Sequence, residues 1–166
     1  MKIKTIKPQK AICLDDESCI LENIRHIYHL SNTKKKRLYS NTIKAVFRSA
    51  TDDKKVEYVS KAALKKAKEL GIDLYSMTWL NQNKFDPKRK IFHYEHCNPI
   101  KELRSAVLDT DESTQKILKR DIVCWILKSE NKELDKHGYR EKRPGGWQKC
   151  YKECGIKFVK NKKNII

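Results

Sequence analysis

The stretch Ile91-Phe-His-Tyr-Glu-His-Cys-Asn-Pro99 does most to decide how this chain is organised. Its β-branched and aromatic residues predict a short strand over 91–96, which Pro99 then ends. Three ionisable groups lie near the end of that strand, namely His93, Glu95 and His96. Because side chains alternate along a strand, His93 and Glu95 share one face. Two imidazoles beside a carboxylate indicate a site for metal or proton chemistry.

A second strand is predicted C-terminal to this stretch. The run Ile122-Val-Cys-Trp-Ile-Leu127 is the most strand-like in the chain, and it leads directly into a predicted helix that Ser129 caps and Gly138 ends. Helical spacing of apolar residues continues between the two strands. The helices expected there cover Ile100 to Leu108 and Ser113 to Leu118.

The N-terminal half has the spacing of amphipathic helices. We expect one helix over Asp16 to Leu30, capped by Asp15 or Asp16, and helical spacing again over 38–47. A third helix is predicted over Asp52 to Leu70, ended by Gly71. Residues 72–90 indicate an irregular connector or a short strand. After 138 the sequence predicts a helix from Trp147 to Cys154 and a short apolar run from Ile156 to Val159.

Positive charge dominates the composition. The chain has 166 residues, 38 Lys and Arg against 21 Asp and Glu, a formal net charge of +17 and a pI near 9.6. Such a charge makes a compact state repel itself, so a partner rich in negative charge is the simplest explanation for it. Duplex nucleic acid fits better than a small acidic ligand, because it carries phosphate along its whole length. The alternative is a lysine-rich protein without such a partner.

Several groups of cations are candidates for contact with phosphate. One is the run at 34–37, another is the basic side of the predicted helix at 52–70, and others lie before the strand at 91 and in the loop after Gly138. For each group the alternative is a solvated surface. The candidate residues are Lys34, Lys35, Lys36, Arg37, Lys61, Lys65, Lys88, Arg89, Arg140, Lys142 and Arg143.

No apolar run reaches the roughly 20 residues that span a bilayer, and the basic N-terminus lacks an apolar segment of signal-peptide length. We therefore expect a cytoplasmic protein without a membrane partner. Six cysteines are then expected to stay reduced. Their spacings differ from the tight pairs of structural zinc sites, so zinc is not expected.

The pattern Glu95-His96-x-x-Pro99 at a strand end resembles the first motif of HNH endonucleases, the ββα-metal nucleases. In that family a second strand leads into a helix whose early His or Asn completes the metal site, and Asn131 stands at that place. The resemblance implies that Glu95 and Asn131 bind Mg²⁺ or Mn²⁺ and that His96 is the general base. His93 is either a further metal ligand or a group that orients the carboxylate.

The match differs from the family in its spacing, because 35 positions separate His96 from Asn131. The helical segment from Pro99 to Arg120 is therefore expected as an insertion between the two strands. The alternative is that Glu95 and His96 are a chance pair at a helix start capped by Asn98.

These observations predict an α+β protein with a basic, mostly helical nucleic-acid-binding region over 1–75 and an HNH-like catalytic region over 76–166. The expected activity is Mg²⁺-dependent hydrolysis of double-stranded DNA, in the manner of a restriction enzyme. One such unit cuts one strand, so a double-strand cut needs a homodimer or two binding events. The alternatives are a DNA-binding protein without catalysis and an RNA-binding or ribosome-associated protein.

Overall fold

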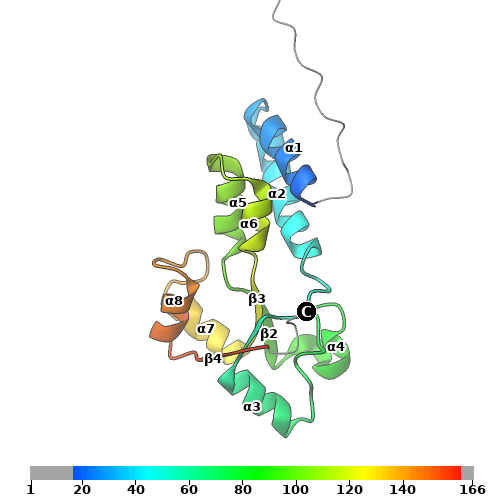
Figure 1. Ribbon diagram of the computed structural model, residues 1–166, viewed down its shortest axis with the longest axis vertical. Helices are drawn as coiled ribbons and strands as arrows, with labels where there is room; N and C mark the ends of the chain where they lie inside the picture. Colours follow the sequence, from blue (N-terminus) through cyan, green and yellow to red (C-terminus); the bar gives the residue numbers. More distant parts are fainter. Residues whose placement is uncertain (1–16, 162–166) are drawn as a thin grey trace, which may run out of the picture.

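The computed structural model describes residues 17–161. Within them a group of four helices is stacked along the long axis on a layer built around a small sheet (Figure 1). Apolar residues at three- and four-residue spacing from three of these helices meet in one core that also includes Ile117. The helices of this group are α1 (Glu17–His29), α2 (Thr33–Ser49), α5 (Ile100–Asp109) and α6 (Thr114–Lys119).

The sheet has four strands in the order β2-β3-β1-β4. β1 runs parallel to β3, whereas β2 is antiparallel to β3 and β4 is antiparallel to β1. The mixed sheet together with the helices confirms the predicted α+β class. The strands are β1 (Tyr58–Ser60), β2 (Phe92–His96), β3 (Val123–Leu127) and β4 (Phe158–Lys160).

Each face of the sheet is covered by its own helices (Figure 1). Phe92, Tyr94 and Trp125 point to the face covered by α3 (Lys61–Glu69), while Cys124 and Ile126 point to the opposite face. Alternating residues of β2 and β3 thus serve two cores, as the pleat requires. The second face carries α7 (Lys128–Lys136) and α8 (Trp147–Glu153), and the connection before β2 holds α4 (Gln82–Phe85) and the 3₁₀ helix η1 (Pro87–Arg89).

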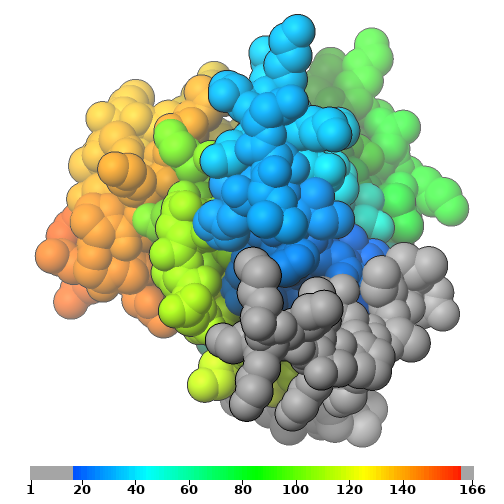
Figure 2. Space-filling view, turned by 90° about the horizontal axis from the view of Figure 1, so that it is seen from above, coloured from blue at the N-terminus to red at the C-terminus, as the bar shows by residue number. Residues whose placement is uncertain are grey.

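The chain passes three times between the helical group and the sheet. It leaves α2 for β1, returns from β2 to α5, and leaves α6 for β3. Two helices, α5 and α6, lie between β2 and β3, where the sequence predicted a helical segment. Viewed from the helical end, the α4 segment and the segment after residue 130 project on opposite sides of α1 and α2 (Figure 2).

The predicted helix over Asp52–Leu70 is wrong in its first half. β1 and a preceding loop occupy 52–60, and α3 begins only at Lys61. The apolar spacing of Val56 and Val59 reflects burial in the sheet core rather than a helical face. Ser60 marks the true start, because its hydroxyl accepts a hydrogen bond from Ala63 N at 3.0 Å.

Other boundaries shift by smaller amounts. The charge run 34–37 lies in the first turns of α2, which Asn32 caps. α7 takes Leu127 as its N-cap residue instead of Ser129, and Asn98 caps no helix because α5 follows Pro99. The proposed caps Asp15 and Asp16 lie outside the described residues.

The helical group and the sheet layer do not correspond to the predicted regions 1–75 and 76–166. β1 and α3 precede that position, yet they belong to the sheet layer, and α5 and α6 follow it but pack with α1 and α2. In residues 17–161 no helix is both long and apolar enough to cross a bilayer. Cys97, Cys124, Cys150 and Cys154 are free thiols.

Candidate functional site

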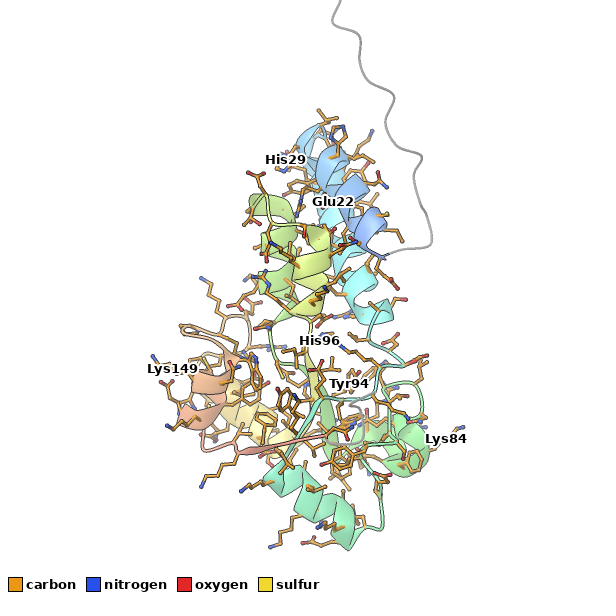
Figure 3. All side chains as sticks on the ribbon, viewed as in Figure 1. Glu22, His29, Lys84, Tyr94, His96 and Lys149 are labelled. Carbon is orange, nitrogen blue, oxygen red and sulfur yellow. The ribbon has the colours of Figure 1, made fainter. Side chains whose placement is uncertain are left out.

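The candidate site lies at the end of β2, where the sheet meets the helical group. Figure 3 shows His96 and Tyr94 at this junction. Two hollows of about 260 and 570 Å³ open there, and both are lined by Arg48, Glu95, His96 and Ile100. The predicted histidine and carboxylate therefore both reach a surface that a ligand can occupy.

A His–Asp pair forms one side of this site. His96 Nδ1 donates a hydrogen bond to Asp121 Oδ1 at 2.7 Å, and the two side chains are 16% and 3% exposed. The other oxygen of Asp121 is buried and has no hydrogen-bond partner within residues 17–161. A desolvated, under-satisfied carboxylate binds an imidazole N–H strongly. The contact fixes the ring, and in the neutral imidazole it assigns the N–H to Nδ1 and the lone pair to Nε2.

The strand pairing explains why His96 and Asp121 meet. His96 stands opposite Val123 in the β2–β3 ladder, and Asp121 lies just beyond the ladder. Two further contacts extend this end, because Cys97 N donates to Ile122 O at 2.8 Å and Asn98 Nδ2 donates to Arg120 O at 2.6 Å. These contacts join the two ends of the segment that holds α5 and α6, next to the site.

Tyr94 anchors the same face of β2. Its hydroxyl donates to the carbonyl oxygens of Thr51 at 2.7 Å and Lys54 at 2.9 Å. Burial raises the pKa of Tyr94, and the nearby negative charge of Asp121 raises it further. The phenol therefore stays protonated, and its single hydrogen remains shared between the two carbonyl oxygens at any physiological pH.

Glu95 points to the opposite face from His96 and has both oxygens occupied. Arg143 Nη2 donates to its Oε1 at 2.8 Å, and His93 Nε2 donates to its Oε2 at 2.9 Å. The predicted role of His93 in orienting the carboxylate agrees with this contact. The Arg143 side chain is 1% exposed, and pairing with Glu95 offsets part of the cost of burying its charge, since Nε and Nη1 are buried without a hydrogen-bond partner within residues 17–161.

The loop before α8 positions Arg143 next to Glu95. Arg143 N donates to Glu102 Oε1 at 2.7 Å, and Gly146 N donates to Arg143 O at 2.9 Å to close a turn. Gly145 and Gly146 have φ values of 76° and 92°, which residues with a Cβ rarely adopt. Arg143, one of the predicted phosphate contacts, therefore acts on Glu95 instead.

Cations surround the mouth of the smaller hollow. Lys44, Arg48 and Arg140 line it and have no ion-pair partner within residues 17–161, whereas Lys101 is paired with Glu141. Unpaired cations beside an imidazole base are suited to hold an anion such as a phosphodiester. Only Arg140 of these three is among the predicted nucleic-acid contacts.

Asn131 lies apart from the other predicted ligands. It stands in the first turn of α7, and α7 follows Leu127, which pairs with Phe92 at the start of β2. Asn131 lines neither hollow. The structure therefore does not bring it to Glu95 as the resemblance implies.

The predicted magnesium ligands do not form a ready-made site. Glu95 already holds Arg143 and His93, so Mg²⁺ would have to displace one of them. Across residues 17–161 no three His, Cys, Asp or Glu side chains are grouped so as to hold a metal ion. Dependence on Mg²⁺ or Mn²⁺ stays a prediction.

The remaining predicted cations are spread over the molecule. The run at 34–37 lies at the N-terminal end of α2, whereas Arg48 lies in its last turn, and Lys36 lies over the ring of Tyr28 at 5.2 Å. The guanidinium of Arg89 stacks on Trp79 at 3.4 Å. The others, Lys61 and Lys65 on α3, Lys88 in η1 and Lys142 in the loop before α8, are exposed.

Sequence reasoning missed Asp121, Lys44 and Arg48. Asp121 directly precedes the strand-like run at 122–127, and antiparallel pairing of that run with 91–96 would have brought it near His96. Lys44 and Arg48 are four apart on α2 and so share a face, but nothing in the sequence places that face beside β2.

Comparison with known proteins identifies no relative. No family model matches the chain, and no curated protein or solved structure matches it significantly.

Proposed function

We propose that this chain is a nuclease that hydrolyses phosphodiester bonds of nucleic acid, with His96 as the general base. The observation that carries the proposal is the hydrogen bond between His96 and Asp121 at the edge of a cation-lined hollow. Asp121 fixes the tautomer in which Nε2 is free to take a proton from an attacking water. It also stabilises the imidazolium that forms.

The charges around the hollow support a phosphodiester as substrate. Lys44, Arg48 and Arg140 are available to bind its oxygens and to stabilise the negative charge that develops during hydrolysis. The net charge of +17 supplies the long-range attraction for a polyanion. Neither the three cations nor the net charge would help to bind a small neutral substrate.

The order of elements supports the resemblance to the ββα-metal nucleases. β2 and β3 are antiparallel neighbours, and α7 follows β3 and contacts both strands. Within that resemblance we propose double-stranded DNA as the substrate, a restriction-type role and Mg²⁺ as the cofactor. A double-strand cut would need a homodimer or two binding events.

A plasmid cleavage assay tests the proposal. Wild type, His96→Ala and His137→Ala are compared with Mg²⁺, with Mn²⁺ and with EDTA. His137 is exposed at the end of α7 and serves as the matched control. We expect cleavage by wild type and His137→Ala, and none by His96→Ala. Activity that survives in EDTA would remove the metal from the proposal, and binding without any cutting would overturn it.

A further inference from the structure

The larger hollow beside His96 has a wall that the proposed hydrolysis does not use. Besides Glu95 and His96 it is lined by Trp79, Asp52 and Tyr94. Its volume of about 570 Å³ lies within the roughly 300–1,000 Å³ of pockets that hold small molecules. An aromatic wall and a carboxylate are unsuited to phosphate, so they point to another part of the substrate.

Trp79 is held rigidly in that wall. The guanidinium of Arg89 lies 3.4 Å from its ring centroid, and Nη2 of Arg89 donates to Trp79 O at 3.0 Å. Lys88 and Arg89 have φ values of 61° and 51°, which cost energy in residues with a Cβ. The buried carboxylate of Asp86 stabilises this turn by accepting from the backbone N–H groups of Lys90, Ile91 and Phe92.

Asp52 supplies an acceptor next to this aromatic wall. Asp52 is among the residues that line the hollow, and its carboxylate has no hydrogen bond or ion pair within residues 17–161. Although the chain has a net charge of +17, no cation among the described residues forms an ion pair with this carboxylate. It would therefore repel a phosphate group. It would accept hydrogen bonds from an N–H-bearing ligand.

From this wall we infer that the larger hollow binds a nucleobase, packed against Trp79 with an exocyclic amino group donating to Asp52. Aromatic side chains bind bases by stacking, and an aspartate accepts from a base amino group. A nucleotide whose base is bound there would have its phosphate near Arg48 and His96, which line the same hollow. The last step rests on the proposed function.

This placement has a consequence for the substrate. His96 is only 16% exposed and lies at the junction of two layers, so a base reaches the hollow only when it has left the stack of a duplex. Within the proposed double-stranded DNA, the favoured target is therefore a nucleotide extruded from the duplex. Mismatched sites should be cut faster than fully paired ones.

Tryptophan fluorescence offers a direct test of base binding. Trp125 is 0% and Trp147 is 7% exposed, so Trp79 is the tryptophan that a ligand can reach. In EDTA and at one ionic strength, a short oligodeoxyadenylate is titrated into wild type, Trp79→Phe and Leu80→Ala. Leu80 is exposed beside Trp79 but lines neither hollow. We expect quenching in wild type and Leu80→Ala and none in Trp79→Phe. Equal quenching in Trp79→Phe would overturn the inference.

Affinity measurements separate base from phosphate contacts. Wild type should bind the oligodeoxyadenylate about tenfold more tightly than an abasic oligomer of equal length, and Trp79→Ala should lose that difference. Asp52→Asn should reduce the preference for deoxyadenylate over deoxythymidylate, whereas Asp53→Asn, the neighbouring exposed carboxylate, should not. Equal affinity of wild type for the normal and abasic oligomers would refute base binding.

The two proposals can fail separately, since binding in EDTA requires no cutting. Plasmid cleavage that depends on His96 without quenching of Trp79 would leave a nuclease and remove the base site. Quenching without cleavage would leave the base site and remove the hydrolysis.

Discussion

At the scale of single residues, replacing Asp121 tests whether its contact with His96 is catalytic or only structural. Asp121→Asn retains the size of the side chain but removes the charge that fixes the His96 tautomer and stabilises its protonated form. We expect the cleavage rate to fall roughly 10²–10⁴-fold, the usual contribution of general acid–base catalysis. Single-turnover kinetics over a pH series checks this. An unchanged rate and pH profile would show that Asp121 merely supports the strand end.

Arg143 makes a prediction about stability. Arg143→Met leaves the partly buried Glu95 without its main partner, so we expect a loss of about 3–5 kcal/mol in the free energy of unfolding. The double variant with Glu95→Gln should recover part of it. Urea denaturation measures both. The exposed pair Lys66–Glu69 is the control, where Lys66→Met should cost less than about 1 kcal/mol.

At the scale of elements, the sequence predicted most of what periodicity can determine. β2 and β3 begin within one residue of the predicted strands, and α5 and α6 lie where the spacing placed them. The segment 52–60 was not predictable in this way, because Val56 and Val59 are buried by tertiary contacts whose spacing also suits a helix. The His96–Asp121 contact could have been found only by pairing the predicted strands 91–96 and 122–127 in the correct antiparallel register.

Ser60 connects two elements and gives a prediction at this scale. Its hydroxyl caps α3 and donates to Glu130 Oε2 at 2.6 Å, and that carboxylate also accepts from Leu127 N at the start of α7. Ser60→Ala should lower the free energy of unfolding by about 1–3 kcal/mol, from the lost cap and the weakened link. Urea midpoints measure this. Ser113→Ala, which removes the longer and exposed cap contact of α6, should cost less.

At the scale of the whole molecule, the cysteines predict how stability depends on pH. Burial raises the pKa of Cys124, Cys150 and Cys154, so these thiols hold their protons in the folded state while unfolded thiols ionise near about pH 8.5. The folded state then binds more protons than the unfolded state, and stability falls as pH rises. Urea midpoints should decrease between about pH 8 and 9.5. A flat profile would contradict the raised pKa values.

The triple passage of the chain between its two layers also bears on the order of folding. His96 and Asp121 lie at the two ends of the inserted α5–α6 segment, so they meet only after that segment has closed on itself. Closing a loop costs entropy before any contact repays it, and α5 and α6 shorten the loop by folding first. We therefore expect the His96–Asp121 pair to assemble late in folding, so that an incompletely folded chain has no oriented His96. If the chain has the proposed nuclease activity, a newly made chain would gain it only after both layers had joined.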